Sequence, residues 1–334
     1  MKLKLMLSAL ALVFATGANS SNHVCEGFVP ENDLKIPVGK TMYGVMNNGG
    51  LTEAQFNAVI DRAILLYSDV IKAKGGTLKV NRLWTDETVN ASATQAAGVW
   101  EVNMYGGLAR HADITVEGFA LVICHEIGHH VGGAPKVNNI FGMNAWATNE
   151  GGSDYFAGLK CLRQFFADED NASIVTTREV EPAAKELCAK QFAGAKEQAL
   201  CERISLAGQS VAYLFQALRK ETVKPSYSTP DTKEVTKMND NHPDTQCRMD
   251  TYLAGTVCAV PLSTMQDDKD ANVGTCVQGT DAAGFRPRCW FKPANATGGG
   301  GEESSCPLGS DQICEMACQF SPSLPFCKPK TIFH

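Results

Sequence analysis

The first strongly periodic segment of the chain runs from Thr52 to Gly76. Its apolar residues recur three and four positions apart, which is the spacing of one face of an α-helix. Thr52 and Gln55 form a capping-box pattern at its start, and Gly75-Gly76 provides a stop. The pattern predicts a long amphipathic helix. The apolar positions are Phe56, Val59, Ile60, Ala63, Ile64, Tyr67 and Ile71.

Two segments after this helix alternate between apolar and polar residues. They cover Gly76–Trp84 and Gly98–Gly106, and both contain β-branched and aromatic side chains. This alternation is typical of β-strands. We therefore predict two strands separated by a polar turn.

Three later segments have helical patterns. The segment 113–133 is apolar until it reaches "CHEIGHHVGG", which predicts a buried helix with histidines in its C-terminal half. A second helix is expected to begin near Asn149 and to continue through "CLRQFF". A helical hairpin follows over 182–220, with Cys188 and Cys201 near its turn.

The N-terminus has the composition of a secretory signal. Two lysines precede an apolar run from Leu5 to Phe14, and small residues around Ala18 offer a cleavage point. The apolar run is shorter than the roughly 20 residues that span a bilayer. The sequence thus predicts a signal peptide over 1–18 and a mature chain without a transmembrane segment, exported to the periplasm or the extracellular space.

Charge and cysteine content narrow the classes of function. The formal net charge is −6, and it becomes −8 without the two signal lysines, so a nucleic-acid partner is not expected. All thirteen cysteines lie beyond the predicted signal, which suits an oxidising compartment. Because thirteen is odd, at least one thiol lacks a partner within the chain, and we expect it to be Cys124 on the apolar run.

The distribution of cysteines also suggests a domain division. Six of them fall between Cys276 and Cys327, in a region with few periodic apolar residues. Regions of this kind are commonly held together by disulfides rather than by a large core. We predict a main domain over 19–258 and a cysteine-rich C-terminal extension over 259–334.

The stretch "HEIGH" is the first candidate for chemistry. His125 and His129 are four residues apart, so both imidazoles project from one face of a helix and can bind one Zn²⁺, with Glu126 beside them. Alone, the stretch is equally compatible with a helix end that is rich in histidine. A catalytic zinc site usually needs a third protein ligand.

The third ligand is expected from the segment "NEGGSD". The alternative spacing, with a histidine six residues after His129, fails because that position holds Pro135. Glu150 can instead supply a carboxylate ligand, and Asp154 lies one helical turn later on the same face. Asp154 is then expected to accept a hydrogen bond from the nitrogen of His125 that does not bind metal.

With these residues the sequence resembles the gluzincin zinc peptidases, and within them the HtpX-like and CAAX-prenyl-protease-like family. The segment 90–108, "NASATQAAGVWEVNMYGGL", is similar to the family's strand before the zinc helix. The segment "HPDTQCR" is similar to its histidine-proline motif followed by arginine, which implies active-site roles for His242 and Arg248. The resemblance implies an α+β, zincin-like, mainly helical catalytic domain. It also implies a small sheet whose edge strand precedes the zinc helix.

The resemblance implies a mechanism as well. One Zn²⁺ held by His125, His129 and Glu150 would activate a water, and Glu126 would act as general base. A polypeptide substrate would bind in extended form along the strand Gly98–Gly106. His242 or Arg248 would stabilise the oxyanion, although His242 could instead occupy the open zinc position.

The sequence therefore favours an exported zinc-dependent endopeptidase. A second hypothesis is a catalytically silent envelope protein that keeps the fold and acts as a binding or assembly factor. A third is a purely structural zinc ion with four protein ligands, for example including His242. The sequence leaves the natural substrate and the oligomeric state open.

Overall fold

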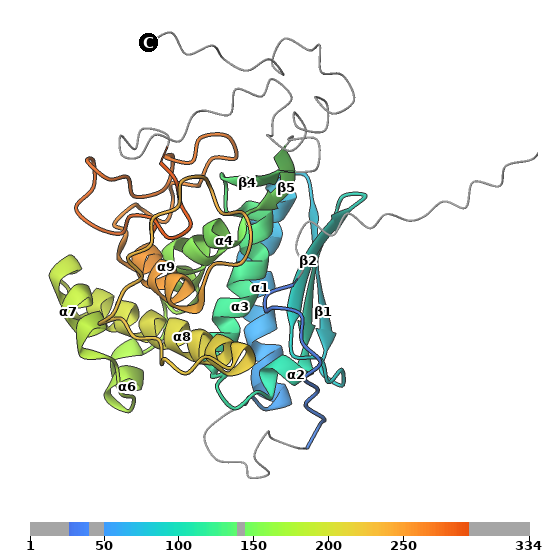
Figure 1. The fold of residues 1–334 in the computed structure, drawn as a ribbon. Coiled ribbons are helices and arrows are strands. Elements are labelled where there is room, and N and C mark those ends of the chain that lie inside the picture. Colours follow the sequence, from blue (N-terminus) through green and yellow to red (C-terminus); the bar gives the residue numbers. More distant parts are fainter. Residues whose placement is uncertain (1–26, 40–49, 139–143, 294–334) are drawn as a thin grey trace, which may run out of the picture.

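The described part of the chain combines helices with two small sheets (Figure 1). The computed structural model describes residues 27–39, 50–138 and 144–293, so the predicted signal peptide over 1–18 lies outside the described residues. The helices are α1 (Glu53–Ala73), α2 (Gly106–Ala109), α3 (Val116–Val131), α4 (Glu150–Phe156), the π-helical turn η1 (Ala157–Cys161), α5 (Leu162–Phe165), α6 (Asn171–Thr176), α7 (Pro182–Gln191), α8 (Ala195–Arg219) and α9 (Thr245–Val257). The strands are β1 (Thr77–Leu83), β2 (Ala91–Ala96), β3 (Val99–Tyr105), β4 (Lys136–Asn138) and β5 (Asn144–Thr148). This mixture confirms the α+β class.

Helix α1 forms where the periodic pattern predicted it. The side chain of Thr52 accepts a hydrogen bond from the backbone of Gln55, and the side chain of Gln55 in turn accepts one from the backbone of Thr52. The predicted capping box is therefore confirmed. The apolar face of α1 packs on α3 and on β1, which fixes one side of the central helix.

The larger sheet differs from the sequence-based prediction. Its order is β1-β3-β2, with β1 parallel and β2 antiparallel to β3. The segment predicted as a polar turn contains β2. Its sequence, "ASATQA", lacks the run of β-branched or aromatic residues that is typical of strands, so the pattern did not predict it. The strand predicted over Gly98–Gly106 is therefore central rather than at the edge. Because both its neighbours bond to it, it cannot also bind an extended substrate, and that prediction was wrong.

Both outer strands, β1 and β2, are edges of this sheet, and β2 is the edge strand that contacts α3. The turn at Ala97-Gly98, with φ values of 48° and 80°, joins β2 directly to β3 as a two-residue hairpin. In this register Ala93 lies opposite Val102, and Gln95 lies opposite Trp100. Both are positions of β2 that do not hydrogen-bond to β3, so their backbone N–H and C=O groups point away from it. Beyond Ala91, which already accepts a hydrogen bond from the backbone of Phe28, the outer edge of β2 thus presents backbone groups that another strand could pair with.

Helix α3 lies at the centre of the molecule (Figure 1). It contacts α1, α4, α8 and the sheet, and every residue from Glu117 to Val131 is buried. Thr115 caps its start by accepting a hydrogen bond from the backbone of Gly118. The predicted buried helix is confirmed.

A disulfide ties α3 to the π-helical turn η1. Cys124 pairs with Cys161, and their Cα atoms lie 5.6 Å apart. The prediction that Cys124 is the unpaired thiol was therefore wrong. We expected a free thiol because Cys124 is buried on α3. The segment α4–η1 packs against the same buried face, however, and brings Cys161 next to Cys124.

The helical hairpin over 182–220 is confirmed as α7 and α8, and Cys188–Cys201 links them across the turn. Helix α9 then packs closely on α4 and η1. Glycines permit this approach, since a Cβ atom on Gly158 or Gly255 would collide with the facing backbone at Tyr252 or Tyr155.

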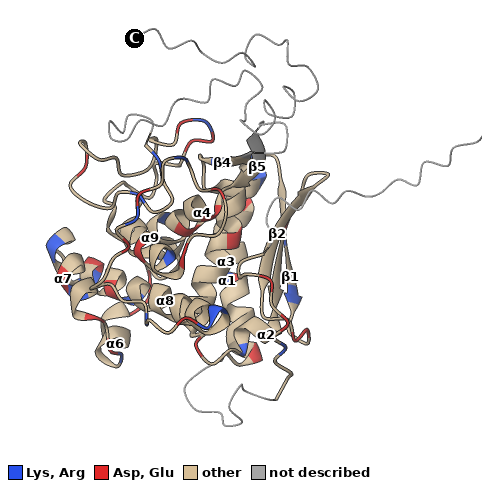
Figure 2. Cartoon of the chain, in the orientation of Figure 1, with Lys and Arg blue, Asp and Glu red and all other residues tan. Residues whose placement is uncertain are grey.

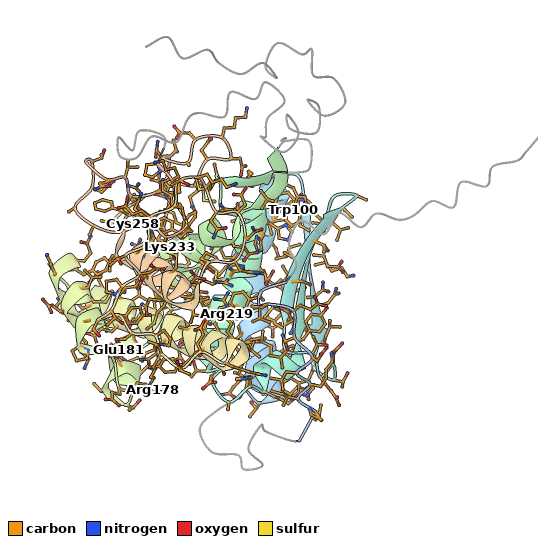
Figure 3. All side chains as sticks on the ribbon, in the orientation of Figure 1. Trp100, Arg178, Glu181, Arg219, Lys233 and Cys258 are labelled. Atoms are coloured by element: carbon orange, nitrogen blue, oxygen red, sulfur yellow. A yellow bond between two sulfur atoms is a disulfide. The ribbon has the colours of Figure 1, made fainter. Side chains whose placement is uncertain are left out.

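The chain after α9 covers the outer side of α4 and α9. Side chains fill the space between these helices and the loops that follow Cys258 (Figure 3). Trp290 is fully buried there and donates a hydrogen bond to Thr251, while disulfides Cys247–Cys289 and Cys258–Cys276 hold the loops. Residues 259–293 share this small core with α9, and the predicted domain boundary stays a prediction. The remaining cysteine-rich tail lies outside the described residues.

Two features bear on the environment of the protein. Within the described ranges, no helix is both long enough and apolar enough to cross a membrane. Basic and acidic residues are interspersed over the helices and loops that the structure describes (Figure 2). Glu126 on α3 and Glu150 and Asp154 on α4, by contrast, are buried inside the helical core, and these three belong to the site.

Candidate metal centre

The two histidines of "HEIGH" share one face of α3. Their imidazole rings meet edge to face, with centroids 4.6 Å apart. The Nε2 atom of His125 lies 3.3 Å from Glu150 Oε2, and the Nε2 atom of His129 lies 3.6 Å from Glu150 Oε1. All three side chains are buried. The structure therefore brings Glu150 of "NEGGSD" next to the two histidines of "HEIGH", as the sequence predicted.

Glu150 is placed by the start of α4. Asn149 caps this helix by accepting a hydrogen bond from the backbone of Gly152, and its own amide donates to Asp240. Helices α3 and α4 approach closely at Gly128, where a Cβ atom would lie 3.1 Å from Ser153 Cα. A glycine at this position therefore brings the carboxylate within reach of both imidazoles.

These residues fit a metal ion. Their candidate ligand atoms all lie within 4.8 Å of one another. His125 Nε2 and Glu150 Oε2 are buried and make no hydrogen bond, although they lie close enough to count as an ion pair. Buried polar atoms without hydrogen bonds are rare in folded proteins, and two imidazoles with a carboxylate are a common donor set for a divalent metal. His125, His129 and Glu150 can thus hold a metal ion.

Hydrogen bonds on the opposite ring nitrogens orient both imidazoles. His125 Nδ1 lies 2.7 Å from Asp154 Oδ1, which is the contact expected of Asp154. His129 Nδ1 lies 2.8 Å from the carbonyl oxygen of Thr148 and 3.0 Å from the Ser153 hydroxyl. A proton on each Nδ1 atom satisfies these acceptors and turns the Nε2 lone pairs toward Glu150.

The carboxylate of Asp154 is itself held by Arg248. Arg248 donates from Nε and Nη2 to the two oxygens of Asp154, each at 2.8 Å, and from Nη1 to the carbonyl of Phe28 at 2.9 Å. Its guanidinium also stacks on the ring of Phe215. Both charged groups are fully buried, so each requires the other.

Electrostatics of the metal-free cluster follow from this arrangement. Burial disfavours the charged form of Glu150, but His129 and the neighbouring bonds outweigh it and hold the pKa of Glu150 well below its usual range. Burial lowers the pKa of His129 to about 4. Burial also opposes protonation of His125, yet Asp154 and Glu150 prevail and raise its pKa to about 9. A metal must therefore displace a proton from His125.

Glu126 lies beside the cluster without belonging to it. Its side chain is fully buried, and neither carboxylate oxygen has a hydrogen-bond partner. Burial raises the pKa of Glu126 to about 8. An unpartnered carboxyl group of this kind is suited to exchanging a proton near neutral pH.

The two residues from "HPDTQCR" take different positions. His242 Nε2 lies 3.2 Å from Glu150 Oε2 and 2.8 Å from the carbonyl oxygen of Gly27. His242 is thus at the edge of the metal cluster. Arg248 lies behind His125, where its guanidinium is bound to Asp154, so the structure places it as a support for the ligand shell. The catalytic roles predicted for both stay predictions.

Two other histidines do not join the cluster. His130 stacks between Trp100 and Trp146, with ring centroids 5.4 and 4.9 Å away, and its Nε2 atom contacts the carbonyl of Glu101. His111 is buried before α3 and accepts a hydrogen bond from the backbone of Asp113. The contacts of His130 and His111 therefore indicate structural roles for both residues rather than metal binding.

The structure brings two further sets of residues to the site that sequence reasoning missed. Ser153 and the carbonyl of Thr148 bind His129, and they carry no motif of their own. Phe28 packs edge to face on His125 at 4.8 Å, from a segment nearly 100 positions earlier in the chain. Only the proximity of Ser153 to Glu150 and Asp154 could have suggested a role.

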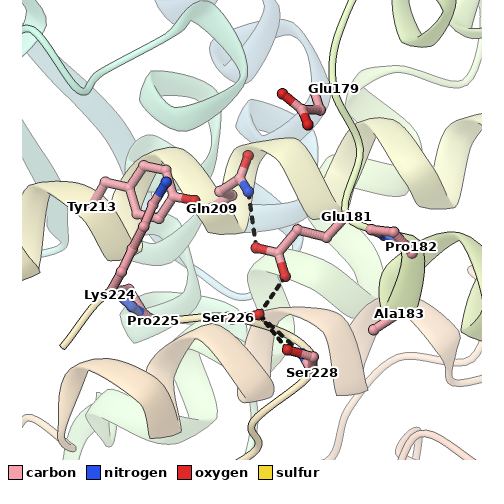
Figure 4. Close-up of a pocket in the computed structure, with 10 residues that line it drawn as sticks. All are labelled: Glu179, Glu181, Pro182, Ala183, Gln209, Tyr213, Lys224, Pro225, Ser226 and Ser228. Atoms are coloured by element: carbon pink, nitrogen blue, oxygen red, sulfur yellow. Dashed lines mark hydrogen bonds between the residues drawn. The ribbon is translucent and has the colours of Figure 1, made fainter.

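Other candidate sites in the described residues are less persuasive. Asp231, Cys247 and Cys289 also cluster, but the two cysteines form a disulfide and so have no thiolate to offer a metal. A pocket of about 620 Å³ lies between α7 and α8 (Figure 4). Its carboxylate Glu181 already accepts hydrogen bonds from Gln209 and Ser226, so it has a structural role.

Comparison with known proteins finds no matching family model, no matching curated protein and no matching solved structure. The gluzincin resemblance consequently rests on the motifs and on the metal centre itself.

Proposed function

We propose that this chain is an exported zinc-dependent endopeptidase of the gluzincin type. One observation carries the proposal: a buried, unpartnered Glu126 sits beside three residues that can hold a metal. A structural metal site needs no such carboxylate, whereas peptide hydrolysis needs a base next to the metal. The hydrogen bonds behind His125 and His129 support a preorganised site.

His125, His129 and Glu150 would hold the metal, with Asp154 and Arg248 fixing His125. A bound zinc ion would polarise the scissile carbonyl and lower the pKa of a water molecule. Glu126 would take the proton of that water on its carboxylate and pass it to the leaving amine. His242, at the edge of the cluster, would donate a hydrogen bond to the oxygen on which charge develops.

The substrate strand is reassigned to the outer edge of β2. Ala93 and Gln95 direct backbone polar groups away from β3, and β2 contacts α3. An extended peptide added there would continue the sheet alongside the helix that carries His125 and His129. The four disulfides of the described residues agree with export to an oxidising compartment.

The deciding experiment compares wild type with Glu126→Gln and Glu150→Ala. Metal content would be measured by mass spectrometry and cleavage on a peptide library, with and without a chelator. Glu126→Gln should retain metal but lose at least about 100-fold in cleavage rate, because a general base contributes that much or more. Glu150→Ala should lose both. The exposed Glu186→Gln on α7 is the matched control and should retain both.

Undiminished cleavage by Glu126→Gln would refute the mechanism. Stoichiometric metal in a wild-type protein that cleaves no peptide would instead favour the structural or silent alternative.

A further inference from the structure

Residues 27–36 form an arm that runs along the chain leading into β2, and we call this segment the edge arm (Figure 1). The backbone of Phe28 donates a hydrogen bond to the carbonyl of Ala91, the first residue of β2, at 2.9 Å. At the other end of the arm, the backbone of Ile36 donates to the carbonyl of Glu87 at 2.9 Å. An isolated antiparallel bridge lies between these two contacts. The edge arm is therefore antiparallel to its partner and occupies this edge as far as Ala91.

The edge arm is a fixed part of the fold. Phe28 and Val29 have no exposed surface. The backbone of Val29 donates to the Asn90 side chain at 3.1 Å, and the side chain of Asn32 donates to the carbonyl of Val89 at 3.2 Å. Hydrogen bonds to buried backbone groups are costly to leave unmade. A substrate strand therefore cannot take the place of the edge arm.

The edge arm ends at the metal centre. The carbonyl oxygen of Gly27 lies 2.8 Å from His242 Nε2, which lies 3.2 Å from Glu150 Oε2. The ring of Phe28 packs edge to face on His125, with centroids 4.8 Å apart. The metal cluster and the start of β2 are thus at the same level along the sheet.

Helix α3 and strand β2 lead away from this level together. His125 lies near Ala91, through the contacts of the edge arm. His130 lies further along, because its Nε2 atom is 3.3 Å from the carbonyl oxygen of Glu101, and Glu101 pairs with Thr94 on β2. The edge of β2 beyond the arm therefore lies on one side of the metal cluster, and the arm lies on the other side.

The remaining edge of β2 sets the direction of a bound peptide. No backbone hydrogen bond from another described segment reaches Ala93 or Gln95. Antiparallel pairing is slightly more stable than parallel pairing, and the edge arm already pairs in that sense on the same line. Because β2 runs away from the metal cluster, an antiparallel peptide runs toward it. At about 3.4 Å per residue, the edge from Ala93 to Ala96 pairs with about four peptide residues.

We propose that the enzyme recognises its substrate by backbone pairing on the N-terminal side of the cleaved bond only. The inference rests on the proposed function and specifies its substrate class: polypeptides with an extended, unpaired stretch of about four residues before that bond. Residues after the bond meet the edge arm at Phe28 and Gly27, so no sheet edge remains for them. The edge arm is thus a specificity determinant that limits the length of the pairing groove.

The first test varies the length of the substrate. The full mature chain, loaded with zinc, would be assayed on the best-cleaved peptide of a library and on versions extended by one to four residues at either end. Each added pair of backbone hydrogen bonds on the N-terminal side should raise kcat/KM at least about fivefold, until the edge of β2 is filled. Extension beyond the second residue after the cleaved bond should change kcat/KM less than twofold.

The second test places single N-methyl groups along the same peptide. In an extended strand, alternate N–H groups point to the same neighbour. Methylation of the second, third and fourth residues before the cleaved bond should therefore alternate between a loss of at least fivefold and an effect below twofold. The tolerated positions are matched controls, because they carry the same methyl group. Methylation of the second and third residues after the bond should have an effect below twofold at both.

The possible results separate this inference from the proposed function. A dependence on length or an alternation on both sides of the bond, on the C-terminal side only, or on neither side overturns the inference and leaves the peptidase intact. A zinc-loaded wild-type chain that cleaves no peptide of the library overturns both.

Discussion

Asp154 and Arg248 are 94 positions apart in the sequence, yet they form a fully buried pair with two parallel hydrogen bonds of 2.8 Å. The pair stands behind His125, whose Nδ1 atom contacts the same carboxylate. Through it, α9 fixes the orientation of a metal ligand on α3.

The first prediction concerns this pair. Asp154→Asn should weaken metal binding by about 10- to 100-fold, because it removes the charge that orients His125. It should also destabilise the fold by about 3 kcal/mol, since the guanidinium of Arg248 is left buried without its counter-charge. Metal competition with a chelator and urea unfolding measure the two effects. Wild-type metal affinity in this variant would contradict the assigned role.

The second prediction tests the approach of α3 and α4. In Gly128→Ala the new Cβ atom would lie 3.1 Å from the backbone carbonyl of Ser153 and 3.0 Å from the ring of Phe156. The helices must separate, at a cost of about 1–3 kcal/mol in the free energy of unfolding. Glu150 then moves away from the imidazoles, so metal content should fall as well. If Gly128→Ala were as stable as wild type and kept its full metal content, the close approach of α3 and α4 at Gly128 would not be required.

The third prediction concerns the disulfide between α3 and η1. Replacing Cys124 and Cys161 together by alanine opens a loop of 37 residues. The free energy of unfolding should fall by about 3–4 kcal/mol. The matched change at Cys188 and Cys201 opens a loop of 13 residues and should cost less. Free thiols in the unmodified protein at Cys124 would contradict the pairing.

The fourth prediction is a pH dependence of stability. Burial raises the pKa of Asp250 to about 6, above its ordinary value of 3.8, although Asp231 and Gln246 donate hydrogen bonds to it. The folded chain therefore holds this proton more tightly than the unfolded chain, and the associated stability is present at low pH. It is lost as the pH rises from about 4 through 6, by about 2 kcal/mol.

Comparison with Asp250→Asn isolates this effect. The difference in unfolding free energy between wild type and this variant should shift by that amount between pH 4 and pH 7. Asp244→Asn removes an exposed carboxylate just before the start of α9 and serves as the matched control. A pH-independent difference for Asp250→Asn would exclude the effect.

The fifth prediction tests the reassigned substrate strand and rests on the proposed function. Gln95→Pro removes a backbone N–H that points away from β3, so it should raise KM for an extended peptide several-fold while β2 stays paired. Gln95→Ala keeps that N–H and should behave as wild type. Equal KM values for the two variants would place the substrate elsewhere.

Much of the local structure was determined by the sequence alone. The periodicity and capping box of α1, the buried character of α3 and the α7–α8 hairpin each depend on residues near in the chain. The candidate metal ligands could also be predicted from the sequence. His125 and His129 are one helical turn apart and so project from the same face, and Glu150 is the first residue of a predicted helix.

The tertiary structure decided what depends on contacts between distant segments. The short strand β2 exists because β3 pairs with it, and this pairing moved the sheet edge away from Gly98–Gly106. Cys124 forms a disulfide, and is not the predicted free thiol, because η1 packs on the same face of α3 and brings Cys161 to it. Arg248 supports Asp154, and Gly27 reaches the metal centre, only because the fold brings four separate segments together. No local pattern encodes such proximity, since it arises from packing and from burial of charge.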